Sequence, residues 1–308
     1  MQRRVSSAGV GGYLLVVRDG QPLFERSYGS VRRDTPMAVA STAKWMTATT
    51  VMTFVDEGAL TLDEPISRWL PQFSGDKATI TMRQLLDHTS GIKQQDCIWN
   101  MSDVLASCVD RLAAGRLEFA PGSAFSYGNA SYHVAARVLE VISGRDFQTL
   151  FGERVAGPLG LTATRWAPGT TRNPSPAASA RTSAGDAARF LQAMLQGGEL
   201  DGHRVVSPAS AAELQRNQVA DYDVSHDYSV GITRIPRYGL GTWVDVVDPD
   251  GRTVVVSGNG ALGFYPWIDH RNGVYGVLAV EDQRGAEVAV PASKQVVDQV
   301  VAVFDHAG

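Results

Sequence analysis

The chain places a serine hydroxyl and a lysine amine three residues apart at the start of an apolar helical pattern, in the stretch Ser41-Thr42-Ala43-Lys44. Apolar residues recur at helical spacing before a glycine that favours a helix end, at Trp45, Ala48, Met52, Val55 and Gly58. Residues i and i+3 share one helix face, so we expect the Lys44 amine within reach of the Ser41 oxygen. A helix N-terminus also favours a serine that becomes anionic during attack on a carbonyl. The pattern predicts an activated serine nucleophile, with an N-cap serine and a surface lysine as the alternative.

Two other serine-lysine pairs have the same spacing, Ser74 with Lys77 and Ser90 with Lys93. In both pairs the serine is followed directly by glycine, which does not favour a helix that would hold the lysine. Sequence context therefore favours Ser41 as the nucleophile.

A second candidate element presents a phenol and an amide together, at Tyr127-Gly128-Asn129, in a turn before an amphipathic helical pattern. If a neighbouring ammonium lowers its pKa, Tyr127 can take the proton from Ser41 and return it to a leaving group. Asn129 can orient a substrate carbonyl or Lys44, or it can simply cap the next helix. The identity of the immediate base stays open, because burial favours neutral Lys44 whereas a nearby tyrosinate favours its charged form.

Four motifs occur in the order typical of one family of serine hydrolases. They are Ser41-x-x-Lys44, Leu85-Leu86-Asp87-His88-Thr89-Ser90-Gly91-Ile92, Pro121-Gly122 followed by Phe125-Ser126-Tyr127-Gly128-Asn129, and Ser183-Ala184-Gly185-Asp186. Over most of its length the chain resembles the class C β-lactamase superfamily, which includes penicillin-binding D-alanyl-D-alanine peptidases and family VIII carboxylesterases. The resemblance implies that Ser41, Lys44 and Tyr127 are catalytic and that no cofactor is needed.

The third active-site element of that family is a strand with Lys, His or another side chain, then any residue, then glycine. The best match is Gly258-Asn259-Gly260-Ala261, in which Gly258 stands where a cation or imidazole is expected. Gly260 permits close backbone approach, and the Ala261 N–H, on an opposing strand, can join that of Ser41 in an oxyanion hole. A glycine-rich bulge in an edge strand is the structural alternative.

The missing side chain at position 258 bears on the substrate. Penicillins and peptidoglycan stem peptides carry a carboxylate, which a positive group usually binds. Gly258 supplies none, although Arg234, Arg237 or Arg271 could do so from nearby loops. We therefore favour a carboxylesterase acting on small neutral esters. The alternatives are a β-lactamase or D-alanyl-D-alanine peptidase acting on lactams or amides, and an acyltransferase or non-catalytic binding protein on the same scaffold.

Composition excludes some function classes. The net charge of -4 and the absence of a basic tract argue against a nucleic-acid partner. No apolar run approaches the ~18 residues of a membrane span. No export signal is visible, so the chain is expected to be cytoplasmic as given, or periplasmic or secreted if a leader was removed. No metal-ligand spacing is present, and we expect no metal; the oligomeric state is not indicated.

Three further features carry expectations. If Cys97 and Cys108 lay on one continuous helix, their Cα atoms would be roughly 16 Å apart, too far for a disulfide, although a loop near Cys97 would change this. His88 is interpreted as a structural residue bonded to backbone. Loops 93–101 and 217–238 are expected to shape the acyl pocket or to pack, through Trp99, Tyr222, Tyr228 and Tyr238.

Turn signals and periodicity predict an α/β (α+β) fold of the β-lactamase/transpeptidase-like kind. Hairpins are predicted over residues 11–29, 243–256 and 264–280, about Asp19-Gly20, Asp250-Gly251 and Asn272-Gly273, and a terminal helix over 291–304. Helices are expected near Thr81, Ser102 and Ser131. An antiparallel sheet lobe, 1–59 and 181–308, would be flanked by helices, with a mainly helical lobe, 60–180, inserted and the active site between them.

Overall fold

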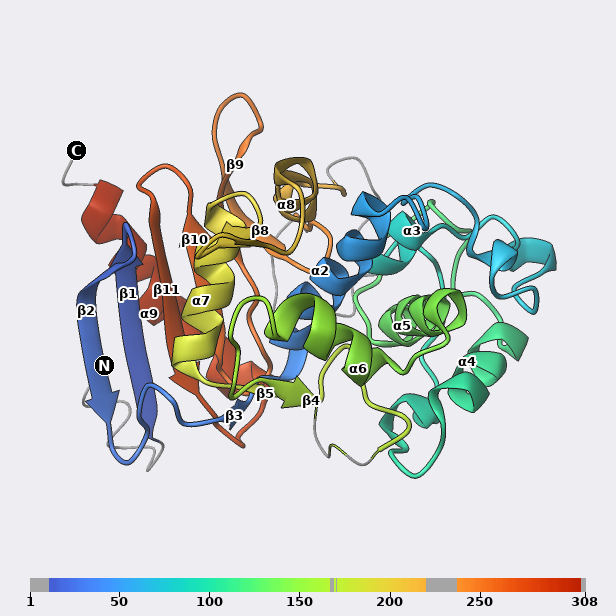
Figure 1. Ribbon diagram of the computed structural model, residues 1–308, viewed down its shortest axis with the longest axis horizontal. Helices are drawn as coiled ribbons and strands as arrows, with labels where there is room; N and C mark the ends of the chain where they lie inside the picture. Colours follow the sequence, from blue (N-terminus) through green and yellow to red (C-terminus); the bar gives the residue numbers. More distant parts are fainter. Residues whose placement is uncertain (1–10, 167–168, 170, 220–236, 306–308) are drawn as a thin grey trace.

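The computed structural model of the 308-residue chain describes residues 11–166, 169, 171–219 and 237–305. Within these residues, six strands form one antiparallel sheet in the order β2-β1-β11-β10-β9-β8 (Figure 1). The strands are β1 (Gly12–Arg18), β2 (Gln21–Tyr28), β8 (Trp243–Val247), β9 (Thr253–Ser257), β10 (Tyr265–Asp269) and β11 (Val274–Val280). Because β1 pairs with β11, both ends of the chain build the sheet, as predicted.

The three predicted hairpins are confirmed, and their turns show why they form. Asp19 and Gly20 join β1 to β2 with φ angles of 53° and 73°, the left-handed values that a tight hairpin turn requires. Gly251 and Gly273 have φ angles of 79° and 61° in the other two turns. Short-range turn chemistry therefore sets the pairing of these strands.

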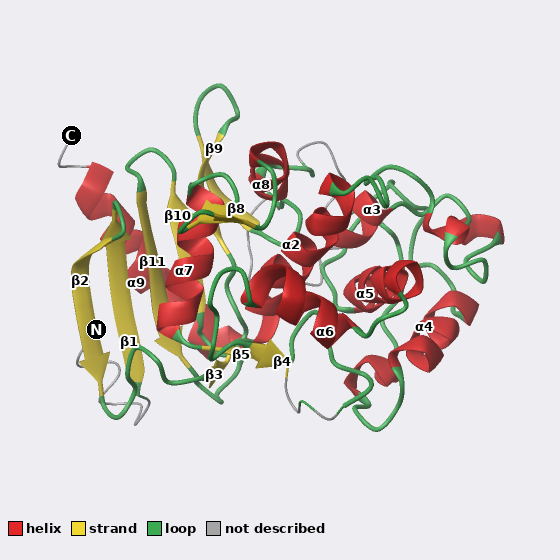
Figure 2. Ribbon diagram, viewed as in Figure 1, coloured by secondary structure: helices red, strands yellow, loops and turns green. Residues whose placement is uncertain are grey.

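Helices cover both faces of the sheet (Figures 1 and 2). Helix α7 (Ala184–Leu195) packs on β1, β10 and β11, whereas α9 (Ala286–Asp305) packs on β10 from the opposite face. Strand β1 serves both layers: Leu15 and Val17 belong to the main core, and Leu14 and Val16 to the smaller core beneath α9. The predicted terminal helix is confirmed and begins earlier than expected, at Ala286.

The helix after Ser41, α2 (Ala43–Asp56), lies in the middle of the molecule and packs on α5, α6 and α8. Nearly all of its residues are buried, and its buried threonines donate hydrogen bonds to backbone carbonyls. The other helices are α3 (Met82–Leu86), α4 (Leu105–Ala114), α5 (Ala130–Ser143), α6 (Phe147–Phe151) and α8 (Pro208–Gln215). The expected helices of the central segment are thus present.

Short strands complete the secondary structure: β3 (Met37–Ala38), β4 (Arg165–Trp166) and β5 (Ala180–Thr182) form a small sheet, and β6 (Glu199–Leu200) pairs with β7 (His203–Arg204). Strand β4 lies within residues 60–180, yet it pairs with β5 at the boundary of that segment. The division into two lobes at residues 60 and 180 stays a prediction.

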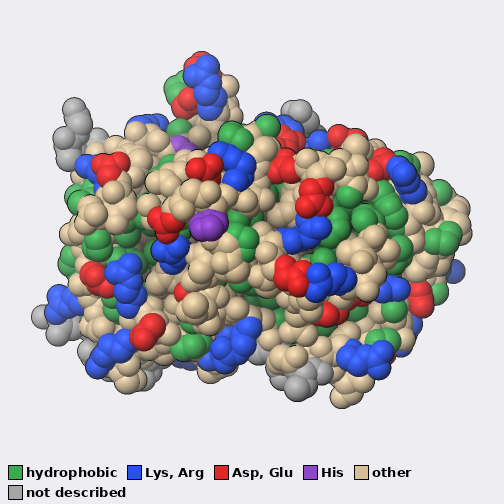
Figure 3. Space-filling model, in the orientation of Figure 1, with side chains coloured by type: hydrophobic (Ala, Val, Ile, Leu, Met, Phe, Trp, Pro, Cys, Tyr) green, Lys and Arg blue, Asp and Glu red, His purple; other side chains and the backbone are tan. Residues whose placement is uncertain are grey.

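The surface is mixed in charge. On the face shown in Figure 3, acidic and basic side chains are interspersed over sheet and helices. No helix in the described part of the chain is long and apolar enough to cross a bilayer.

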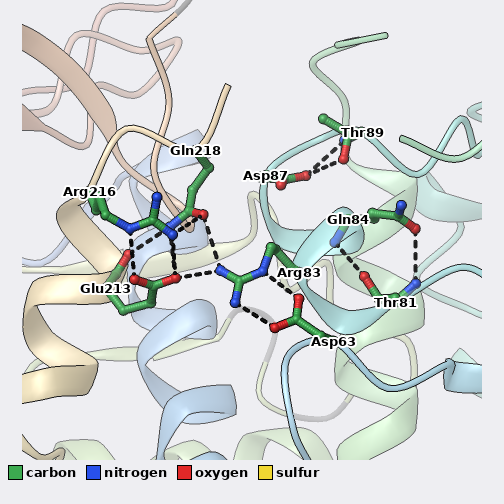
Figure 4. A network of polar contacts seen from close by, with 9 residues as sticks. All are labelled: Asp63, Thr81, Arg83, Gln84, Asp87, Thr89, Glu213, Arg216 and Gln218. Carbon is green, nitrogen blue, oxygen red and sulfur yellow. Dashed lines mark hydrogen bonds and ion pairs between the residues drawn. The ribbon is translucent and has the colours of Figure 1, made fainter. Parts of the chain in front are cut away.

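Arg83 clamps α3 to neighbouring elements (Figure 4). Its guanidinium donates to both carboxylate oxygens of Asp63, at 2.6 and 2.8 Å, and also pairs with Glu213 on α8. A capping box between Thr81 and Gln84 fixes the N-terminus of this short helix. Since α3 ends just before residues 87–91, the clamp also holds the start of that segment.

The structure contains a disulfide between Cys97 and Cys108, with a Cα–Cα distance of 5.3 Å. The two cysteines do not share one continuous helix, which is the case that the sequence left open. Cys97 lies in a separate 3₁₀ helix, Asp96–Trp99, and residues 100–104 bring the chain back to α4. Asn173 fixes this segment further by donating from Nδ2 to the carbonyls of Cys97 and Asn100.

We expect the double variant Cys97→Ser/Cys108→Ser to unfold with a free energy lower by about 3 kcal/mol, because a short loop is no longer closed in the unfolded chain. Urea unfolding of the oxidised parent and the variant measures the difference. Equal midpoints for the two proteins would contradict a stabilising role for the disulfide.

Candidate active site

Ser41 lies in a short 3₁₀ helix, Ala40–Thr42, that leads directly into α2. Ala40 adopts a left-handed backbone with φ of 46°, which is costly for a residue with a Cβ. Such strain is found at functional sites, where the surrounding structure holds it in place. The strained turn leaves Ser41 half-buried at the head of the helix, as the spacing predicted.

Lys44 is the centre of the site. Its side chain is fully buried, and its Nζ lies 3.1 Å from Ser41 Oγ and 2.8 Å from Asn129 Oδ1. The carbonyl oxygen of Ala177 lies 3.4 Å away on a third side. Burial lowers the pKa of Lys44 to about 7, because a charged amine is poorly solvated there. Near neutral pH a substantial fraction of the amine is therefore neutral and able to accept a proton.

Tyr127 faces the same point from the turn before α5. Its ring lies 4.6 Å from Lys44 Nζ, and its hydroxyl is close enough to that of Ser41 to affect the pKa of the phenol. Trp243 stacks on the ring, with centroids 5.0 Å apart. The structure therefore brings the three predicted catalytic side chains together.

The ionisation suggested for Tyr127 is corrected by the structure. Burial raises the pKa of Tyr127 well above its usual value, and the hydrogen bond with Ser41 offsets only part of that rise. The expected lowering of the Tyr127 pKa by a neighbouring ammonium is wrong, because desolvation of the phenolate is the largest influence and raises the pKa. Tyr127 is a neutral hydrogen-bonding group, and Lys44 is the group whose basic form is accessible.

Asn129 orients Lys44. It occupies the N-cap position of α5, but its side chain makes no capping hydrogen bond and instead accepts from Lys44. Its backbone is held by two side chains: its N–H donates to Gln94 Oε1 at 2.9 Å, and its carbonyl contacts His133 Nδ1 at 3.2 Å. The capping alternative is therefore wrong for the amide of Asn129.

The segment after β9 packs against the residues around Ser41. A Cβ at Gly260 would lie 2.1 Å from the carbonyl oxygen of Val39, so glycine alone permits this approach. A Cβ at Gly258 would lie 3.2 Å from the Trp45 ring, which leaves little room for a larger side chain. Ala261 lies in the turn between β9 and β10 and not on a strand as expected. Its role in an oxyanion hole stays a prediction.

The competing serine-lysine pairs do not form comparable sites. Lys77 follows Ser74 in a 3₁₀ helix, Gly75–Lys77, and its ammonium pairs with Asp76. Ser90 is buried and hydrogen-bonded to the hydroxyl of Ser131, at 2.8 Å.

The aromatic and cationic candidates lie in different settings. Tyr238 is buried and its ring lies 5.8 Å from that of Tyr127, so it packs beneath the site. Trp99 is 59% exposed. Arg237 is exposed beside Tyr238, and Arg271 lies in the turn between β10 and β11. Tyr222, Tyr228 and Arg234 lie outside the described residues.

Sequence reasoning missed three contributors: the Ala177 carbonyl, Gln94 and the stacking ring of Trp243. Every residue carries a carbonyl, so no sequence signal marks the one that meets Lys44. Gln94 and Trp243 reach the site through loops and strands far apart in the chain.

The sequence model of the family named Beta-lactamase matches residues 2–300. The chain belongs to the beta-lactamase family. It is 33% identical over 252 residues to penicillin-binding protein 4 of Amycolatopsis lactamdurans, which covers 68% of this chain and 66% of that protein. Over 180 residues it is 31% identical to esterase EstB of Burkholderia gladioli, covering 49% and 46% of the two chains. The chain thus spans between about half and about two thirds of these relatives.

Solved structures agree with this family. A Bacteroides dorei protein assigned to the beta-lactamases superposes with a TM-score of 0.86 and 32% identity, covering 96% of this chain and 95% of the other. A family VIII carboxylesterase, at 21% identity and a TM-score of 0.74 over 91% of this chain and 89% of the other, shares the fold. The fold class and the resemblance to this superfamily of serine hydrolases are confirmed.

We expect Lys44→Met to raise the free energy of unfolding at pH 7, because folding of the parent removes a proton from an amine that is charged when unfolded. The unfolded chain binds that extra proton between the folded pKa of about 7 and the unfolded value of 10.5. Parent stability should therefore rise with pH across this window, on the order of 1 kcal/mol per unit, relative to the variant. Urea unfolding at pH 7, 8.5 and 10 tests this. A constant difference between the two proteins would show that folded Lys44 stays charged.

Proposed function

We propose that this protein is a serine hydrolase that cleaves small esters or amides through an acyl-enzyme on Ser41, with neutral carboxylic esters as the preferred substrates. The observation that carries the proposal is the fully buried Lys44 amine 3.1 Å from Ser41 Oγ. A general base must lie within hydrogen-bond reach of the proton that it takes, and its pKa must suit the working pH. Lys44 meets both conditions.

The contacts of Lys44 support its role as the immediate base. A neutral amine has two N–H groups and one lone pair. Asn129 Oδ1 and the Ala177 carbonyl, 2.8 and 3.4 Å from Nζ, can accept these two N–H groups. In the neutral amine that we propose, the lone pair is then left to accept from the Ser41 hydroxyl, whose oxygen lies 3.1 Å away. Ser41 Oγ then attacks the substrate carbonyl carbon while its proton passes to Lys44.

The remaining steps need a donor to the leaving group and a place for negative charge. Tyr127 contacts Ser41 and can pass a proton from the Lys44 ammonium to the leaving oxygen or nitrogen. In this proposal, the N–H groups of Ser41 and Ala261 bind the oxyanion. Water, activated by Lys44 in the same way, then releases the acyl group and restores Ser41.

The lack of a side chain at Gly258 favours neutral substrates. Glycine has no side chain at this position, and an added Cβ would already lie 3.2 Å from the Trp45 ring. A substrate carboxylate therefore finds no cation at this position. The second candidate, a β-lactamase or D-alanyl-D-alanine peptidase, is supported by the 33% identity to penicillin-binding protein 4 of Amycolatopsis lactamdurans.

We expect Ser41→Ala to lose labelling by a fluorophosphonate and to lower turnover of p-nitrophenyl esters by at least about 10³-fold, because the nucleophile is absent. Ser74→Ala is the matched control, since Ser74 has the same spacing to a lysine but is exposed and should leave both readings unchanged. A chromogenic cephalosporin is tested in parallel, and slow or absent turnover is expected. If Ser41→Ala still forms the adduct, the assignment of the nucleophile is wrong. Faster turnover of the cephalosporin than of the esters would favour the second candidate.

We expect kcat/KM for an ester to fall about tenfold per pH unit below pH 7, because protonation of Lys44, with its pKa of about 7, removes the base.

Tyr127→Phe should lower kcat by a factor on the order of 10² to 10⁴ and change KM little, since it removes proton transfer and little contact area. Steady-state kinetics from pH 5 to 10 measure both effects. If kcat/KM already falls as the pH is lowered from about 10, Lys44 is not neutral at pH 7 and the prediction fails. If Tyr127→Phe changes KM alone, its role in proton transfer is contradicted.

A further inference from the structure

His88 combines two unfavourable features beside the catalytic site. It is buried in the segment after α3, and its backbone is left-handed, with φ of 66°. Its Nε2 is buried and has no hydrogen-bond partner among the described residues. Strained backbone and an unsatisfied buried polar atom both reduce stability, and each calls for a reason in a folded protein.

The contacts of His88 concentrate on the turn that carries Tyr127. The His88 ring lies 4.5 Å from the ring of Tyr127, between centroids. The N–H of Gly128 donates to His88 Nδ1 at 3.4 Å, and the N–H of Ser126 donates to the His88 carbonyl at 3.0 Å. His88 therefore contacts the tyrosine and both of its neighbours in the chain.

Packing alone does not explain a histidine at this position. The ring is enclosed by Phe125, Tyr132 and Tyr238, with centroids 5.9, 5.3 and 4.9 Å away. An apolar side chain would fill such a cage without an unsatisfied nitrogen. What an apolar side chain cannot supply is the acceptor that holds the Gly128 N–H.

We propose that His88 is a positioning residue that fixes the Tyr127 hydroxyl against Ser41, through its ring contact and its hydrogen bond from Gly128. The inference rests on the proposed function of the site. Burial, and then the charge of Lys44, hold the pKa of His88 well below its usual range. His88 therefore stays neutral, carries its proton on Nε2 because Nδ1 accepts, and acts by geometry rather than by proton transfer.

The test compares His88→Gly with His88→Asn, because both residues tolerate the left-handed backbone. Asparagine retains an acceptor near the position of Nδ1, whereas glycine removes it. His88→Gly should lower kcat for a p-nitrophenyl ester on the order of 10- to 100-fold, with KM within about threefold, since a small displacement of a reacting group is enough. His88→Asn should recover most of this loss.

A double-mutant cycle with Tyr127→Phe separates positioning from a general structural role. If His88 acts through Tyr127, His88→Gly should cost less than about threefold in kcat when the phenol is already absent. Equal losses in both backgrounds, or no recovery by asparagine, would overturn the proposal. If His88→Gly does not fold, His88→Ala takes its place in the same cycle.

A control variant and a labelling experiment distinguish failure of this inference from failure of the proposed function. His270→Asn, in the turn between β10 and β11, is the control for replacing a histidine that is hydrogen-bonded elsewhere, to Gln215, and it should match the parent. Fluorophosphonate labelling of Ser41 reports on the proposed function itself. If Ser41→Ala loses activity but His88→Gly keeps the parental kcat, only the inference on His88 fails. If Ser41→Ala keeps its activity, the proposed function fails.

Discussion

The enclosure of the Lys44 amine is the constraint on which the rest of the site depends. An ammonium removed from water is strongly disfavoured unless it is paired with a negative charge. Its hydrogen-bond partners here are an amide oxygen of Asn129, a carbonyl of Ala177 and the hydroxyl of Ser41, all of them neutral. These groups can bind a neutral amine and fix its orientation. The burial that disfavours the charged amine, and so lowers the stability of the fold, is also what lowers the pKa of Lys44 to about 7.

The elements around Lys44 are arranged to hold that environment. The 3₁₀ helix Ala40–Thr42 supplies Ser41 and the first turn of α2 supplies Lys44, while Gly260 packs closely on the backbone of Val39 just before them. On the other side, α3 is fixed by Arg83, and the segment that follows it places His88 against Tyr127. Two of the non-glycine residues with a left-handed backbone, Ala40 and His88, lie beside this site, where strain is common.

Much of the fold was predictable because its signals are local. The Asp-Gly and Asn-Gly turns marked the hairpins, and the apolar spacing after Ser41 marked α2. The proximity of Ser41 to Lys44 also follows from helix geometry alone. The disulfide was not predictable, because its formation depends on where the chain turns after Trp99. The ionisation of Tyr127 and the partner of the Asn129 side chain depend on burial and on residues distant in the chain.

The sequence by itself determined the elements, the spacing of the catalytic pair and the family to which the chain belongs, since these follow from short-range geometry and ordered motifs. Only the tertiary structure shows the surroundings that shift the pKa of each group. Desolvation depends on every atom packed around a charge, and here it lowers the pKa of Lys44 while it raises that of Tyr127. The same packing places the Trp45 ring 3.2 Å from where a Cβ at position 258 would lie.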